Sequence, residues 1–122
     1  MRAALLATVL VASVSVAGCS SSPPASQASI DPSAVRLVAS GQQFVTKEAS
    51  APANQPFQIA FESQTSDGHN LAIAVPNADP IFRSEVFSGP TTKTFAIEPL
   101  AAGSYIYRCD VHPGMQGTLT VK

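Results

Sequence analysis

The stretch that decides the fold is GSYIYRCDVHPGMQGTLTV, residues 103–121. Successive side chains of a β-strand point to opposite faces, so Tyr105, Tyr107 and Cys109 would share one face of a strand that begins near residue 103. Cys109 then stands where this strand ends, on a rigid base. The pattern predicts a strand that delivers a thiol directly into the next loop.

A second strand is expected after that loop. Pro113 and Gly114 are turn-forming residues and predict that the chain reverses there. Residues 116–121 alternate again, with Leu119 and Val121 expected to point inward. The loop is therefore predicted to be anchored at both ends by neighbouring strands.

Short alternating segments continue through the rest of the chain from residue 34 onward. They are separated by Pro, Gly, Asn and Asp, and no segment has a convincing helical pattern. The segments expected to be strands lie at residues 35–38, 44–51, 57–61, 71–75, 81–87, 91–97, 104–108 and 116–121. About seven or eight short strands predict an all-β fold, an antiparallel β-sandwich.

Length and composition restrict the possibilities further. A chain of 122 residues is enough for one small domain, and ten Pro with only 12% charged residues argue against a helical bundle. The formal net charge is −1, with charges scattered along the chain. A nucleic-acid-binding protein would need a basic patch, which the sequence lacks.

The beginning of the chain has the pattern of an export signal. Arg2 precedes an apolar run that is too short for a comfortable membrane span of about 20 residues. The run ends in VAGC, residues 16–19, which resembles the lipobox of bacterial lipoproteins, where the Cys is lipidated. An ordinary signal peptide cleaved nearby is the alternative. The lipobox implies an exported protein with a lipid anchor at Cys19, on the extracytoplasmic or periplasmic side of a cell-envelope membrane.

The sequence thus divides into three expected parts. Residues 1–18 would be the lipoprotein signal peptide, and residues 19–33 the lipidated Cys19 with a flexible tether rich in Ser, Pro and Ala. Residues 34–122 would be the folded domain. If Cys19 carries lipid, Cys109 has no cysteine partner and is free to bind a metal as thiolate. A Cys19–Cys109 disulfide remains possible only if the lipobox assignment is wrong.

Cys109, His112 and Met115 fall at positions 1, 4 and 7 of the loop. Two imidazoles, a thiolate and a weak axial thioether are the donor set of a copper electron-transfer site. The second imidazole can come only from His69, the other His of the chain. His69 lies between a predicted turn and the strand at 71–75, so it could reach the loop. Taken alone, it would more often be a solvated turn residue.

These residues resemble the cupredoxins, the blue copper proteins of the plastocyanin and amicyanin type. The resemblance covers residues 44–122 and rests on three motifs: Gly-His-Asn before a strand, Gly-x-Tyr-x-Tyr-x-Cys, and Cys-x-x-His-x-x-Met. It implies a Greek-key sandwich that holds one type 1 copper ion. The implied ligands are His69 and His112 through Nδ1, the Cys109 thiolate and, as a long axial ligand, Met115.

The resemblance also implies supporting roles around the ligands. Tyr105 falls at the family's tyrosine corner, and Asn70 at the position that braces the ligand loop by hydrogen bonds. Where amicyanin-like loops often have Pro, this chain has Val111, whose N–H could donate to the Cys109 sulfur. Such a bond would raise the reduction potential, so Val111→Pro is expected to lower it in voltammetry.

The favoured function is one-electron transfer between redox proteins of the cell envelope by a monomeric, membrane-anchored carrier that is not an enzyme. Both histidines are used as ligands, so none remains to bind a substrate at copper. Zinc is disfavoured because it prefers carboxylate over thioether, and Asp110 would point to the opposite strand face. Copper delivery or protection is the alternative, and a metal-free module would leave the donor pattern unexplained.

Overall fold

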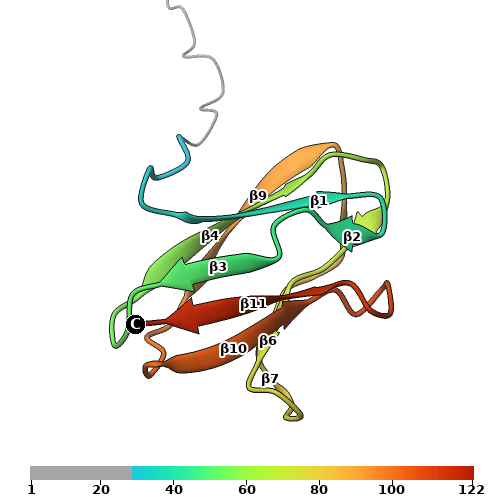
Figure 1. The fold of residues 1–122 in the computed structure, drawn as a ribbon. Coiled ribbons are helices and arrows are strands. Elements are labelled where there is room, and N and C mark those ends of the chain that lie inside the picture. Colours follow the sequence, from blue (N-terminus) through green and yellow to red (C-terminus); the bar gives the residue numbers. More distant parts are fainter. Residues whose placement is uncertain (1–28) are drawn as a thin grey trace, which may run out of the picture.

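Eleven strands make up the part of the chain that the structure describes, residues 29–122 of a computed structural model (Figure 1). They are β1 (Val35–Ser40), β2 (Gln43–Phe44), β3 (Glu48–Ala51), β4 (Phe57–Ser63), β5 (Gly68–His69), β6 (Ala72–Ala74), β7 (Pro80–Arg83), β8 (Phe87–Ser88), β9 (Thr91–Ile97), β10 (Gly103–Arg108) and β11 (Gln116–Val121). Within this range no helix could cross a membrane. The predicted signal peptide, Cys19 and most of the predicted tether lie outside the described residues.

The strands form two larger sheets and one short pair. One sheet has the order β2-β1-β4-β9, the other β3-β11-β10-β6-β7, and β5 pairs with β8. Both larger sheets contribute to one core, which contains Leu37, Ile59 and Phe61 from the first sheet and Ile73 and Leu119 from the second. The predicted all-β sandwich is confirmed.

Strand direction and strand number differ in detail from the expectation. The pairs β1–β4 and β3–β11 are parallel, so the sheets are mixed rather than purely antiparallel. Alternation within a segment reports its faces but not the direction of the partner that it meets. The number of strands exceeds the predicted seven or eight because the structure also contains three strands of only two residues each, β2, β5 and β8. Such short strands exist through tertiary pairing and leave no periodic signal.

Inward positions follow the predicted alternation in the clearest segment. In β4, Phe57, Ile59 and Phe61 are buried and Gln58 is exposed, but Ala60 on the outer face is buried too. Full burial of one large apolar side chain contributes roughly 1.5–3 kcal/mol. The same agreement holds in β11, where Leu119 and Val121 are buried as expected.

The hairpin of β10 and β11 carries the predicted ligand loop (Figure 1, dark orange and red). Its register runs from Gly103 opposite Val121 to Arg108 opposite Gln116, so residues 109–115 leave and re-enter the sheet at neighbouring positions. On its other side β10 pairs with β6, with Arg108 opposite Ala72. Because Ala72 follows His69 by three residues, this pairing brings the second histidine to the same end of the sheet.

Two tyrosines fix the hairpin from its inner face. The Tyr105 hydroxyl donates to the carbonyl of Ala101 over 2.9 Å, as expected of a tyrosine corner. The buried Tyr107 donates to the carbonyl of Thr46 over 2.6 Å, across to the segment between β2 and β3. Its ring covers Gly117 on β11, where a Cβ atom would collide with it. The base of the ligand loop is therefore tightly packed.

Candidate metal centre

The ligand loop is a small closed ring of backbone. The N–H of Cys109 donates to the carbonyl of Met115 over 2.9 Å, and the N–H of Met115 donates to the carbonyl of His112 over 3.1 Å. Gly114 has φ +83°, a backbone conformation that is strained for any residue other than glycine. The turn predicted at Pro113 and Gly114 is present, and it folds the three loop residues of the predicted donor set back on one another.

His69 reaches this loop from a distant part of the chain. It ends β5, is fully buried, and pairs in the short sheet with Phe87 of β8. Its Nδ1 lies 3.9 Å from Cys109 Sγ, and Nδ1 of His112 lies 3.8 Å from the same sulfur. All three donor atoms lie within 4.8 Å of one another. The structure thus brings His69 to the thiol of Cys109, forty residues later in the sequence, and to the imidazole of His112.

The two sulfur–nitrogen distances fit a single metal ion. An ion that is about 2.3 Å from sulfur and about 2.0 Å from nitrogen, as zinc is in proteins, separates trigonal donors by about 3.7 Å. The two observed sulfur–nitrogen distances are 3.8 and 3.9 Å. Thiolate and imidazole in a trigonal arrangement are the equatorial donors of type 1 copper. The residues present therefore fit that ion.

Met115 completes the predicted set from the end of the loop. Its side chain is buried, at 2% exposure, and its backbone bonds both Cys109 and His112. A thioether at this position is the weak axial donor of the same class of site. Its place in the loop agrees with that role, which stays a prediction.

Burial favours the neutral form of His69, the form that a metal ligand needs. Desolvation lowers the pKa of His69, and the neighbouring charge of His112 lowers it further against the opposing effect of Asp67. His69 Nε2 is buried without a hydrogen-bond partner among residues 29–122. A positive charge on this buried ring would be costly, so the neutral ring is favoured. With its proton on Nε2, the lone pair of Nδ1 beside Cys109 Sγ is available for a metal.

Asn70, next to His69, braces the loop through two hydrogen bonds to one residue. Its side-chain N–H donates to Asp110 Oδ2 over 3.0 Å, and its Oδ1 accepts from the Asp110 N–H over 2.8 Å. The backbone beside Cys109 is thus tied to the backbone beside His69. This is the kind of contact that the resemblance implies for Asn70.

The comparison with protein families agrees with this arrangement. The model of the cupredoxin-like domain matches residues 4–121, nearly the whole sequence. The chain belongs to the cupredoxin-like family. This family binds one type 1 copper ion, and His69, Cys109, His112 and Met115 form a potential site for it.

Solved cupredoxin structures share the fold at low identity. Dithionite-reduced auracyanin of the photosynthetic bacterium Roseiflexus castenholzii has a TM-score of 0.64 and 17% identity, covering 74% of this chain and 97% of that one. Auracyanin A of Chloroflexus aurantiacus, a "blue" copper protein, has a TM-score of 0.58 and 20% identity, and the match covers 71% of this chain and 99% of that one. A reduced Cu(I) amicyanin variant has a TM-score of 0.60 and 18% identity, and the match covers 78% of this chain and 88% of that one. No curated protein matches the chain.

Val111 does not make the hydrogen bond to the Cys109 sulfur that was expected of it in this cupredoxin. The polar atoms close to Cys109 Sγ are the two histidine Nδ1 atoms, and no hydrogen bond from the Val111 N–H to this sulfur is present in residues 29–122. Val111 is 44% exposed. The expected effect of Val111→Pro on the reduction potential stays a prediction without a contact to support it.

Three charged residues beside the centre form ion pairs that the sequence did not predict. The Asp110 carboxylate accepts from Arg83 Nε over 3.0 Å and from Arg108 Nε over 3.1 Å. The hydrogen bond from Asn70 is the largest cause that lowers the pKa of Asp110, followed by the bond from Arg108. Alternation predicted that Asp110 turns away from the Cys109 side, but nothing local indicated that Arg83, 27 residues earlier, would meet it.

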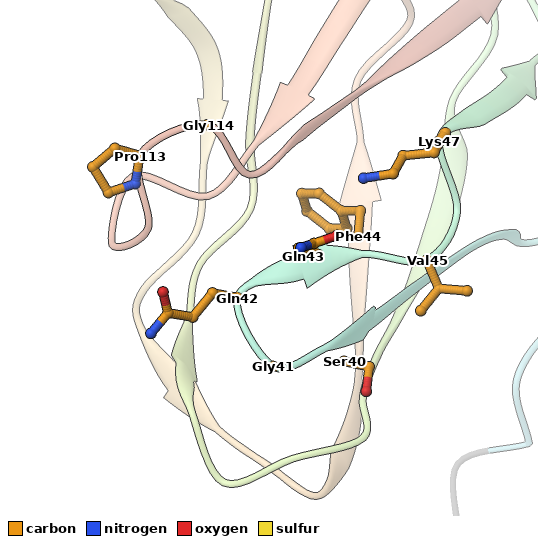
Figure 2. A pocket seen from close by; sticks show the side chains of 9 residues that line it. All are labelled: Ser40, Gly41, Gln42, Gln43, Phe44, Val45, Lys47, Pro113 and Gly114. Carbon is orange, nitrogen blue, oxygen red and sulfur yellow. The ribbon is translucent and has the colours of Figure 1, made fainter.

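An open groove lies against the ligand loop (Figure 2). Its volume is about 900 Å³, and Pro113 and Gly114 face the β1–β2 turn across it. The lining residues are Ser40, Gly41, Gln42, Gln43, Phe44, Val45, Lys47, Pro113 and Gly114. The loop that carries the predicted ligands is thus reachable from the surface, whereas His69 is sealed inside.

Proposed function

We propose that this cupredoxin is a membrane-anchored type 1 copper protein that carries single electrons between redox proteins of the cell envelope. The observation that carries the proposal is the cluster of Cys109 Sγ and the Nδ1 atoms of His69 and His112, in which both sulfur–nitrogen distances are close to those of a trigonal copper site. Copper bound there would supply the one-electron couple Cu(II)/Cu(I).

The surrounding residues suit a carrier. The loop hydrogen bonds and the Asn70 brace hold the donors in fixed positions, so a change of oxidation state requires little rearrangement of the chain. His69 is fully buried, with its ring centroid 5.9 Å from that of Phe61, whereas His112 is partly exposed beside Val111. His112 therefore offers the short route for an electron between the centre and a docked partner.

The donor inventory favours a carrier over a catalyst. The chain has two histidines, and both belong to this centre. A copper enzyme needs further ligands or an open position to bind its substrate. Auracyanin A, which shares the fold, is a "blue" copper protein, and we assign the role of a copper electron carrier to this chain.

The copper test uses the two cysteines as matched variants. Cu(II) added to the protein is expected to give an intense visible thiolate-to-copper band and a reversible one-electron wave in voltammetry. Cys109→Ser should abolish both, while Cys19→Ser should leave both intact. A colourless wild-type protein that binds Zn²⁺ tightly instead would contradict the proposal.

The anchor is tested with the same pair of variants. Labelled fatty acid should be incorporated into the wild type and into Cys109→Ser, and both should sediment with envelope membranes. Cys19→Ser should lose the label and become soluble, because two or three acyl chains are what hold such an anchor stably. Labelling that persists in Cys19→Ser would reject lipidation at this residue.

Copper delivery would show itself as easy loss of the ion. A carrier should retain copper in both oxidation states when challenged with a chelator, over the time of many redox cycles. Rapid transfer of copper to the chelator, combined with a sluggish voltammetric response, would favour delivery or protection.

A further inference from the structure

The Asp110 carboxylate stands at the meeting point of four segments of the chain. It lies in the ligand loop directly after Cys109. Its Oδ2 accepts from Asn70 Nδ2 and Arg83 Nε, both over 3.0 Å, and its Oδ1 accepts from Arg108 Nε over 3.1 Å. Asp110 also donates its N–H to Asn70. One residue of the loop therefore bonds β7, the end of β10 and the segment that follows His69.

This arrangement differs from an ordinary surface ion pair. Hydrogen bonds between ionised groups are shorter and stronger than neutral ones, and several that share one acceptor support one another. An isolated exposed pair contributes little because water screens it and its long side chains lose freedom. The side chains of Asp110 and Arg108 are 32% and 31% exposed, so their ion pair is partly shielded from solvent, whereas the side chain of Arg83 is 57% exposed.

The location of the network connects it to the donor atoms. Asn70 is covalently next to His69, and Asp110 is next to Cys109, so the two Asn70–Asp110 hydrogen bonds set how far apart the two ligands stand. Arg83 and Arg108 hold the carboxylate from the sheet side and restrict its rotation. Without them the carboxylate would be free to turn away from Asn70 toward water.

We propose that Asp110, clamped by Arg83 and Arg108, is a positioning residue that locks the ligand loop to the His69 segment and holds the donors at metal-binding distance without metal. The inference rests on the proposed function only in taking these donors as copper ligands. It adds to the brace by Asn70 an ionic clamp from two other strands.

The first test measures local opening in the metal-free protein by amide hydrogen exchange. The reporters are the N–H groups of Cys109 and Met115, which close the loop. Arg83→Gln leaves the sequence around both reporters unchanged and is expected to accelerate their exchange on the order of tenfold through easier local opening. Asp110→Asn, which removes both ion pairs, should accelerate exchange at Met115 at least as much.

The matched control is Arg36→Gln. Arg36 pairs with Glu62 over 3.2 Å in the opposite sheet, and at 64% its side chain is about as exposed as that of Arg83, at 57%. It should leave both reporters at the wild-type rate. If Arg83→Gln behaves like Arg36→Gln, or accelerates exchange evenly over both sheets, Asp110 forms surface ion pairs only and the proposal is overturned.

The second test loads the same variants with Cu(II). Loss of positioning should disturb the thiolate-to-copper band in the same way in Arg83→Gln and Asp110→Asn, because both free the same loop. A charge effect alone would move the reduction potential in opposite directions with unchanged bands, and would also overturn the proposal. If the wild type shows no band, the proposed function fails while the exchange rates still decide the clamp. If the band is present and exchange is unaffected, only the clamp fails.

Discussion

Met115 is the one predicted ligand whose role depends on a weak bond. It is buried at the end of the ligand loop, and leucine is close to it in volume, so Met115→Leu should change stability by less than about 1.5 kcal/mol. The variant loses a sulfur donor that stabilises Cu(II) more than Cu(I), and the axial ligand tunes the potential of such sites. We expect a retained visible band and a higher reduction potential in voltammetry. An unchanged potential would mean that Met115 is not an axial ligand.

Tyr107 links stability to alkaline pH. Burial, with a smaller contribution from Glu48, raises the pKa of its hydroxyl from 10.0 to about 12. The folded state therefore favours the neutral phenol, and this contribution to stability is complete below pH 10 and is lost as the pH rises from 10 through 12. Tyr107→Phe removes this dependence together with the bond to Thr46.

The stabilities of the wild type and of Tyr107→Phe should therefore converge at high pH. Below pH 10 the variant should be less stable by about 1–2 kcal/mol, because the carbonyl of the half-buried Thr46 loses its donor. Denaturant unfolding of the metal-free proteins at a series of pH values measures the gap, which should narrow between pH 10 and 12. A gap that stays constant would show that the phenol of Tyr107 does not titrate in this way.

At the scale of elements, the β10–β11 hairpin is built around a close approach of ring and backbone. Tyr107 and Gly117 face each other in register, and a Cβ at Gly117 would overlap the tyrosine ring. Gly117→Ala should therefore destabilise the protein by about 1–3 kcal/mol through overpacking, as measured by denaturant unfolding. Gly103→Ala is the control in the same hairpin, because its Cβ would meet only an ordinary contact at 3.7 Å. Equal effects of the two changes would refute this packing argument.

Elements with regular alternation were predictable, and the shortest ones were not. The strands expected at 104–108 and 116–121 correspond to β10 and β11. The segment that holds His69 was expected to be a turn leading into a strand. It is instead a two-residue strand, β5, stabilised by its pairing with β8. Two residues contain no period, so only the tertiary contact reveals them.

At the scale of the whole molecule, the fold should form without metal. The core is one continuous apolar cluster drawn from both sheets, and Cys109 and Met115 are its only members from the ligand loop. The metal-free protein is therefore expected to unfold cooperatively on heating. Cu(II) should raise the melting temperature of the wild type and of Cys19→Ser, because binding favours the folded state, but not that of Cys109→Ser. A metal-free protein without β-structure in circular dichroism would contradict this expectation.

The sequence by itself determined the part of the site that lies within the ligand loop. Cys109, His112 and Met115 are six residues apart from first to last, so covalent geometry alone keeps them together. His69 was predicted as the fourth ligand because it is the only histidine of the chain besides His112. Donor identities thus came from composition and spacing, which any unfolded copy of the chain also has.

The tertiary structure decided distances and partners. That His69 Nδ1 stands 3.9 Å from Cys109 Sγ depends on the pairing of β6 with β10 and on the Asn70 brace, contacts across about forty residues. That Arg83 clamps Asp110 depends on β7 lying beside β6 at the edge of the same sheet. Contacts at such separation arise from the packing of whole sheets against a common core, and no local pattern of residues encodes them.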